Sequence, residues 1–146
     1  WLNGSLAVAD PYTSPEAWAD ECGRVHIYDP PNDTSNQWIL KQTLECEEHR
    51  RTRYIEYGYS LLADGDQLLV GSYQGGFVDV YGPDERGEMV LLQTLAGQCD
   101  PGASCWYFGR SMTLSGDTLV IGAEERFDST INNVVGEVHV YERSVN

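Results

Sequence analysis

The chain has 146 residues, of which 41% are hydrophobic and 11% aromatic, and its 23 acidic and 9 basic residues give a formal net charge of −14. This length and apolar content fit one folded domain with a core rather than a disordered chain. A surface this acidic repels phosphate groups, so we expect no nucleic-acid partner. No stretch approaches the roughly 18 consecutive apolar residues of a membrane span, so we expect no membrane insertion.

The chain contains a series of segments with the composition of β-strands. They are rich in Val, Ile, Leu and Tyr, and Gly, Asp, Asn or Pro residues mark the turns between them, which is typical of strands rather than helices. In chain order the predicted strands are Asn3–Asp10, Gly23–Tyr28, Trp38–Leu44, Tyr57–Ser60, Gly65–Ser72, Gly76–Tyr81, Met89–Leu95, Phe108–Ser111, Gly116–Ala123 and Gly136–Tyr141. The predicted fold class is therefore all-β.

These strands fall into repeating units. Tyr57–Ser60 has the sequence Tyr-Gly-Tyr-Ser, and Phe108–Ser111 has the sequence Phe-Gly-Arg-Ser. The glycines of the two motifs are 51 positions apart, and each motif is followed by the same series of strands. A unit of about 50 residues with four antiparallel strands has the size of a β-propeller blade. We therefore predict tandem blades in one repeat domain that spans residues 1–146.

The predicted domain holds about three blades. Residues 1–50 form the first, 51–100 the second and 101–146 the third. The first blade lacks its first strand and the third lacks its last, so the outer two are incomplete. Three explanations stay open: the sequence is an excerpt of a larger propeller, a neighbouring subunit supplies the missing strands, or the units form an open stack. Exposed strand edges of incomplete blades would favour binding of other copies of the chain.

Two of the predicted blades have long connections between their second and third strands. These are Tyr12–Glu21 and Glu125–Val135, whereas the middle blade has only the short turn Tyr73–Gly75. Long loops of a repeat array leave one face, which is often the binding face, and tolerated insertion is the alternative explanation. Aromatic residues outside the strands are candidate contacts for a glycan or protein ligand, with burial in the core as the alternative: Trp18, Trp106 and Tyr107.

Four cysteines predict two disulfide bonds. No Cys-x-x-Cys pair is present, which argues against a zinc site. Cys22 precedes one strand and Cys46 follows the next, so a hairpin brings them together, while Cys99 and Cys105 close a short loop. Among the three possible pairings we favour Cys22–Cys46 with Cys99–Cys105. Disulfide bonds persist in oxidising compartments, so we expect an extracellular or cell-surface location.

Two sequons indicate the same compartment. Asn3-Gly4-Ser5 and Asn32-Asp33-Thr34 match the acceptor pattern for N-glycosylation. Both fall at predicted turns or strand edges, and an attached glycan is bulky and needs such a surface position. We therefore predict a secreted or surface glycoprotein with glycans at Asn3 and Asn32.

The repeated motif resembles the FG-GAP repeat, a blade motif of integrin-alpha-type propellers and of many surface proteins. Phe108-Gly109 corresponds to the FG element and Gly122-Ala123 to the start of GAP, with Glu124 where the family has proline. Tyr57-Gly58 and Gly71-Ser72-Tyr73 form a more divergent copy. The resemblance extends over nearly the whole chain and implies a β-propeller fold, but it says little about function.

The resemblance also raises calcium binding, because many blades of this family hold calcium in an Asp-x-Asp-x-Asp-Gly loop between the first two strands. In this chain the corresponding loops are 63–66 and 114–117, which are too short to surround a cation that takes roughly six to eight oxygen ligands. We therefore expect no cofactor. Asp128, Asn132 and Asn133 are the other possible calcium ligands, and a polar loop without metal is the simpler interpretation.

The sequence has no recognisable catalytic motif. A Gly-x-Ser-x-Gly motif is lacking, and His26 and His139 occupy equivalent repeat positions, which indicates structural roles. We expect a non-enzymatic glycoprotein that is a structural or adhesive subunit of an assembly or fibre, with other copies of itself or neighbouring surface proteins as partners. Two alternatives stay open: a propeller-type module that binds a glycan or protein ligand, and part of a propeller-bearing hydrolase.

Overall fold

The computed structural model describes residue 2 and residues 4–12, 22–32, 36–46, 55–97, 107–128 and 133–143. In these residues the chain forms ten β-strands in three antiparallel sheets, and no helix. The predicted all-β class is therefore confirmed. None of the described segments is a helix long and apolar enough to cross a membrane.

Each sheet holds consecutive strands in chain order. Sheet 1 consists of β1 (Leu6–Asp10), β2 (Arg24–Asp29) and β3 (Ile39–Glu45). Sheet 2 consists of β4 (Tyr57–Asp64), β5 (Gln67–Ser72), β6 (Phe77–Pro83) and β7 (Met89–Ala96). Sheet 3 consists of β8 (Phe108–Ser115), β9 (Thr118–Asp128) and β10 (Asn133–Glu142). This division agrees with the strands predicted from the repeats.

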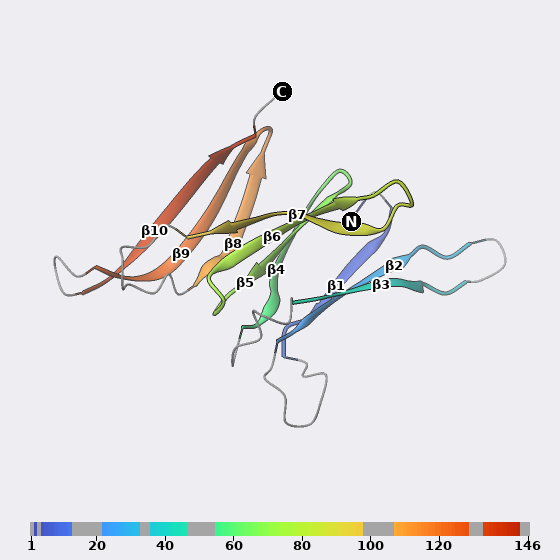
Figure 1. Ribbon diagram of the computed structural model, residues 1–146, viewed down its shortest axis with the longest axis horizontal. Helices are drawn as coiled ribbons and strands as arrows, with labels where there is room; N and C mark the ends of the chain where they lie inside the picture. The colour runs from blue at the N-terminus through green and yellow to red at the C-terminus, as the bar shows by residue number, and fades with distance from the viewer. Residues whose placement is uncertain are drawn as a thin grey trace.

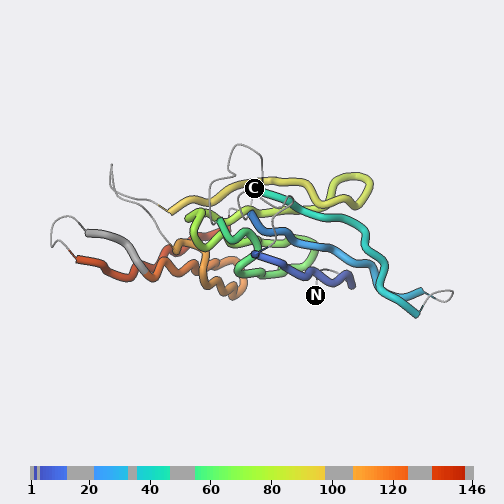
Figure 2. Tube along the Cα trace, turned by 90° about the horizontal axis from the view of Figure 1, so that it is seen from below, coloured from blue at the N-terminus to red at the C-terminus, as the bar shows by residue number. Residues whose placement is uncertain are grey.

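The three sheets follow one another, with sheet 1 and sheet 3 on opposite sides of sheet 2 (Figures 1 and 2). The first strand of sheet 2, β4, contacts β1 and β2, and the first strand of sheet 3, β8, contacts β4, β5 and β6. No sheet closes on itself, and the described residues form an open series of sheets rather than a ring. The predicted blade-like unit is thus present, while closure into a propeller stays a prediction.

Sheet 2 contributes apolar side chains to cores on both of its faces. Alternate residues of a strand point to opposite faces, so consecutive apolar residues reach different cores. On β5, Leu68 and Val70 belong to the core shared with sheet 1, whereas Leu69 belongs to the core shared with sheet 3. Val25 and Ile27 of β2 complete the first core from the other side. None of these five side chains is more than 4% exposed. Since burial of one such side chain contributes about 1.5–3 kcal/mol, packing between sheets is a main source of stability.

Glycine near the start of the first strand lets adjacent sheets approach closely. Gly58 in β4 and Gly109 in β8 have φ angles of 88° and 89°, a conformation that residues with a side chain rarely adopt. A Cβ atom at Gly58 would lie 3.0 Å from Val25 Cγ2, and one at Gly109 would lie 2.8 Å from Val78 Cγ2. Each glycine therefore lies against the equivalent valine of the preceding sheet. This contact is the physical reason for the glycine of the repeated aromatic–glycine motif.

The loop predicted for Glu125–Val135 is wrong. Strand β9 continues to Asp128 and β10 begins at Asn133. These two residues form the first pair of the β9–β10 ladder, and a bulge interrupts the pairing opposite Gly136. The two consecutive valines near the start of β10 favour an extended backbone because they are β-branched. The bulge absorbs the extra residue of β9. The connection is therefore a long hairpin rather than a long loop.

Candidate functional site

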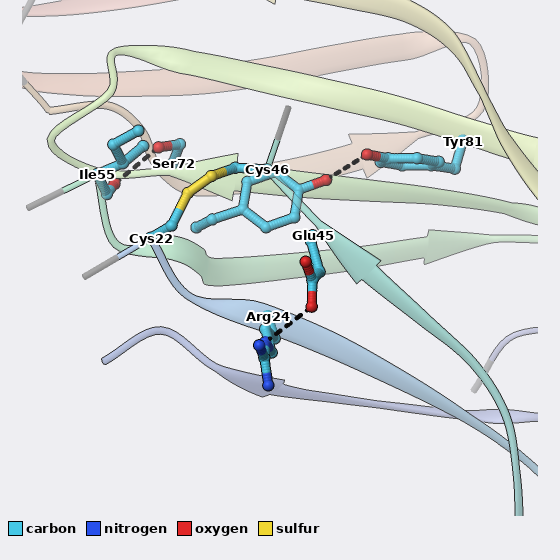
Figure 3. The surroundings of a disulfide bond; sticks show 8 residues. Cys22, Arg24, Glu45, Cys46, Ile55, Ser72 and Tyr81 are labelled. Atoms are coloured by element: carbon cyan, nitrogen blue, oxygen red, sulfur yellow. Dashed lines mark hydrogen bonds and ion pairs between the residues drawn. A yellow bond between two sulfur atoms is a disulfide. The ribbon is translucent and has the colours of Figure 1, made fainter. Parts of the chain in front are cut away.

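A disulfide bond closes one end of sheet 1. It joins Cys22 to Cys46, whose Cα atoms are 6.3 Å apart (Figure 3). Cys22 precedes β2 and Cys46 follows β3, so the bond ties the open end of the β2–β3 hairpin. This is the predicted pairing. Cys99 and Cys105, the other predicted pair, lie outside the described residues.

Polar contacts surround the disulfide bond (Figure 3). Arg24 Nε lies 3.0 Å from Glu45 Oε1, which links β2 to the end of β3. The buried Ser72 hydroxyl donates a hydrogen bond of 2.7 Å to the Ile55 carbonyl oxygen. These contacts join the ends of strands in sheets 1 and 2, so we assign this region a structural role.

Three tyrosines and an arginine meet at the junction of sheets 2 and 3. The members of this tyrosine–arginine cluster are Tyr59 in β4, Tyr73 in the turn between β5 and β6, Tyr107 directly before β8, and Arg110 in β8. The Tyr73 ring centroid lies 4.7 Å from that of Tyr59 and 4.4 Å from that of Tyr107. The guanidinium carbon of Arg110 lies 5.0 Å from the Tyr73 centroid. All four residues are half-buried, so part of each stays accessible.

The repeat register explains why these residues meet. Tyr59 and Arg110 are the third residues of the Tyr-Gly-Tyr-Ser and Phe-Gly-Arg-Ser motifs, and the strands that carry them, β4 and β8, are in contact. The Arg110 guanidinium carbon lies 5.9 Å from the Tyr59 ring centroid. The Tyr107 backbone N–H donates a hydrogen bond of 3.0 Å to the Tyr73 carbonyl oxygen, which joins the start of sheet 3 to the turn of sheet 2.

Charged and strained positions surround the cluster. Arg110 forms an ion pair with Glu124, and Gln74 Nε2 donates a hydrogen bond of 3.0 Å to Glu56 Oε1. Glu56 and Tyr107 have φ angles of 51° and 71°. A positive φ at a residue other than glycine costs about 1–2 kcal/mol, and such positions concentrate at functional sites. The strained backbone positions therefore lie in the same region as the tyrosine–arginine cluster.

The Tyr73 hydroxyl stays protonated far above neutral pH. Burial raises the pKa of Tyr73 to about 12, and a hydrogen bond with the Tyr107 side chain adds to the increase. At neutral pH the hydroxyl is thus a neutral donor and acceptor. The cluster combines apolar rings, neutral hydroxyls and one cation, a composition that suits binding of a ligand.

Sequence reasoning found one member of the cluster. Of the three aromatic residues predicted as ligand contacts, Tyr107 belongs to it, and Trp18 and Trp106 lie outside the described residues. The other three members were missed. The aligned motifs carried a signal for two of them, because equivalent positions of adjacent repeats come together when the sheets stack.

The predicted glycosylation sites are described in part. Asn32 is exposed just after β2, a position that leaves room for a glycan, and its modification stays a prediction. Asn3 lies outside the described residues, as does nearly all of the predicted loop Tyr12–Glu21.

The possible calcium ligands do not form a described site. Asp128 ends β9 and Asn133 begins β10, whereas Asn132 lies outside the described residues. Within the described part of the chain, no group of three or more His, Cys, Asp or Glu side chains is arranged to hold a metal ion.

The two histidines at equivalent repeat positions make contacts within the protein. His26 Nδ1 lies 3.0 Å from Thr43 Oγ1 on the neighbouring strand. The His139 ring meets the Phe108 ring edge to face, with centroids 5.0 Å apart and an interplanar angle of 84°. The first contact is a hydrogen bond between neighbouring strands and the second is ring packing, and both are in keeping with the structural roles inferred from the sequence.

Comparison with protein families identifies the third repeat. Residues 100–141 match the family model described as the FG-GAP repeat. The chain contains an FG-GAP repeat. The matched residues include β8 and β9 and nearly all of β10, and they contain both the Phe108-Gly109 and the Gly122-Ala123 elements. The FG-GAP resemblance seen in the sequence is thereby confirmed for this repeat, and an FG-GAP repeat indicates a propeller-type surface or binding domain. No match is found among curated proteins or among solved structures.

Proposed function

We propose that the chain is a non-enzymatic domain of an extracellular or cell-surface glycoprotein and that it serves in adhesion. The Cys22–Cys46 disulfide bond and the FG-GAP repeat both support a location outside the cytosol. The formal net charge of −14 favours glycan or protein partners over nucleic acid. Binding of such a partner by the tyrosine–arginine cluster is the proposed route of adhesion.

One observation carries this proposal: three tyrosines and an arginine from separate segments meet on one half-buried surface. Residues that dominate binding energy are enriched in tyrosine and arginine. Tyrosine supplies a rigid ring and a hydroxyl with little loss of conformational entropy, and the guanidinium group supplies planar hydrogen-bond donors. The same surface pairs apolar contact with hydrogen bonding, which is the combination that a glycan or a protein surface requires.

The proposal can be tested by measuring how the fluorescently labelled full chain binds to intact cells. Tyr107→Ala and Arg110→Ala should each weaken binding by about tenfold or more, because a dominant contact contributes about 1.4 kcal/mol or more. Tyr12→Ala is the matched control, since Tyr12 is 59% exposed and follows β1 in sheet 1. Unchanged binding in both cluster variants would refute adhesion through the cluster.

The same assay distinguishes the two partner classes. Glycosidase treatment of the cells should abolish binding if the partner is a glycan, and protease treatment should abolish it if the partner is a surface protein. Binding that survives both treatments would contradict the proposed adhesion to either class.

A second role, as a structural subunit of an assembly or fibre, is favoured by the free edge of sheet 3. Strand β10 is ten residues long and has no partner strand on its outer edge within the described residues, whereas β7 fills that position in sheet 2. An unpaired edge can accept a strand from another copy of the chain. Native mass spectrometry and electron microscopy test this role: oligomers or filaments support it, and a monomer contradicts it. The described residues give no observation in favour of the hydrolase alternative.

A further inference from the structure

Three consecutive large apolar residues at the end of the β2–β3 hairpin are exposed. Trp38, which directly precedes β3, is 37% exposed, and the first two residues of that strand, Ile39 and Leu40, are 47% and 52% exposed. A run of exposed apolar residues is unusual unless it has a function, and exposed apolar patches mark binding surfaces. The apolar run Trp38–Leu40 therefore indicates a surface that another group covers.

Sheet 2 leaves this hairpin end uncovered, although it packs against sheet 1. Strands β2 and β3 extend past the neighbouring strands at this end (Figures 1 and 2). Ile27 faces the core shared with sheet 2, and Asp29, two positions later, lies on the same face of β2. The cross-strand partner of Asp29 is Ile39, which is nevertheless 47% exposed. The apolar run thus lies beyond the area that a packed sheet covers.

An acceptor site for a glycan lies at the same hairpin end. Asn32 begins the sequon 32–34, and its side chain is exposed. It follows Asp29, the last residue of β2, by three positions, a distance of at most about 11 Å along the chain. Asp29 in turn pairs with Ile39, the neighbour of Trp38. A glycan on Asn32 therefore begins one short segment away from the apolar run.

The inner sugars of an N-linked glycan have the chemistry that the apolar run requires. The faces of a pyranose ring present C–H groups, which pack against the negative face of an aromatic ring such as that of Trp38, while the sugar hydroxyls stay in water. Attachment to Asn32 holds these sugars at a high effective concentration beside the run. A glycan is also bulky, so it keeps protein partners away from this end of the hairpin. The attached glycan is therefore favoured as the occupant over a second copy or a separate protein.

We propose that the glycan on Asn32 packs against Trp38 and covers the exposed end of the β2–β3 hairpin. This inference rests on the proposed location outside the cytosol, because the glycan must be attached there. It does not depend on ligand binding at the tyrosine–arginine cluster, which lies at the junction of sheets 2 and 3. Opening of the hairpin end must then break the sugar contacts as well as the strand pairing, so the glycan reduces local opening.

Hydrogen exchange of the full chain, secreted from eukaryotic cells, tests the proposal after mass spectrometry has located the glycan. Thr34→Ala keeps Asn32 but removes the sequon. Exchange of the backbone amides in Ile39–Glu45 should be about fivefold or more slower in the glycosylated chain than in Thr34→Ala, because exchange requires local opening.

A double-mutant cycle assigns the protection to the tryptophan. In the Trp38→Ala background, the chains with and without the glycan should exchange at the same rate, because the packing surface is gone. Val90→Ala is the matched control, since Val90 is 40% exposed and lies on β7 in sheet 2. In that background the glycan should slow exchange as much as it does in the original chain.

Three outcomes would overturn the proposal: an Asn32 without glycan in the secreted chain, equal exchange with and without the glycan, and full protection by the glycan in Trp38→Ala. Protection of Thr34→Ala that grows with its concentration would also contradict it, since a second copy would then cover the run.

Cell binding of the same proteins separates this inference from the proposed function. Thr34→Ala should bind cells as the original chain does, because the tyrosine–arginine cluster is unchanged. Failure of the original chain to bind cells would refute adhesion and leave the glycan contact standing, whereas loss of protection with intact cell binding refutes the glycan contact alone.

Discussion

Replacing Gly109 by alanine places a methyl group where sheet 3 meets sheet 2. The φ angle of 89° makes alanine unfavourable there by about 1–2 kcal/mol. The new Cβ atom would also lie 2.8 Å from Val78 Cγ2 and 3.0 Å from the Phe77 carbonyl oxygen, and overpacking of a tight core costs about 1–3 kcal/mol. We therefore expect Gly109→Ala to lower the free energy of unfolding by about 2–5 kcal/mol.

Gly116→Ala separates the two contributions. Gly116 has a φ angle of 59°, but no atom lies within 4 Å of the position that its Cβ would take. This variant should lose only the backbone contribution of about 1–2 kcal/mol. Urea unfolding followed by circular dichroism measures both variants, with the slope checked for two-state behaviour. Equal losses in the two variants would refute the reasoning, because Gly109 would then not lie against sheet 2.

The remaining predictions concern the tyrosine–arginine cluster and the disulfide bond. Because the pKa of Tyr73 is raised from 10.0 to about 12, its contribution to stability is complete below pH 10 and is lost as the pH rises toward 12. In an ultraviolet absorbance titration, Tyr73→Phe should lose a tyrosine component near pH 12; loss of a component near pH 10 instead would contradict this. Glu56→Gly should raise the free energy of unfolding by about 0.5–1 kcal/mol, because glycine adopts the φ angle of 51° without strain and the hydrogen bond lost with Gln74 is exposed. An unchanged or lower urea midpoint would contradict this expectation. Replacing both Cys22 and Cys46 by serine should lower the free energy of unfolding by about 3.5 kcal/mol, which is the chain-entropy value for a bond between residues 24 positions apart. An unchanged free energy of unfolding would mean that the bond does not constrain the unfolded chain.

The strand order could be predicted because each repeat carries its own turns and its own apolar pattern. The predicted strands Asn3–Asp10, Gly65–Ser72 and Gly116–Ala123 correspond to β1, β5 and β9, which are the second strands of their units. The segment Leu68-Leu69-Val70 of β5 is apolar at consecutive positions, as a strand buried on both faces requires, and sheet 2 does lie between two cores. Local chemistry thus determined the elements and their neighbours within each sheet.

The long β9–β10 hairpin could not be predicted in this way. Alternation of apolar and polar residues identifies a strand only when one face is buried. Glu124 and Val134 are both exposed, so this part of the hairpin has no clear buried face to create the pattern. The residues between the predicted strands Gly116–Ala123 and Gly136–Tyr141 were therefore interpreted as a loop, although their pairing makes most of them part of β9 and β10.

The tyrosine–arginine cluster was found only in part because its members come together through contacts between sheets. Tyr73 lies in a turn that sequence reasoning treated as a bare connection, since its neighbours Gly75 and Gly76 dominate the signal. Its ring contacts two residues that belong to the first strands of two different units. Such a site depends on the distance between neighbouring sheets, and this distance cannot be predicted from the spacing of residues along the chain.

Nuclear Overhauser spectroscopy on the isotopically labelled full chain measures the sheet-to-sheet contacts directly. We predict cross-peaks between the Gly58 Hα protons and the Val25 methyl groups, and between the Gly109 Hα protons and the Val78 methyl groups, because each glycine lies against that valine. Cross-peaks within each sheet, without either glycine–valine pair, would mean that the sheets form but do not stack, and would contradict the arrangement on which the tyrosine–arginine cluster depends.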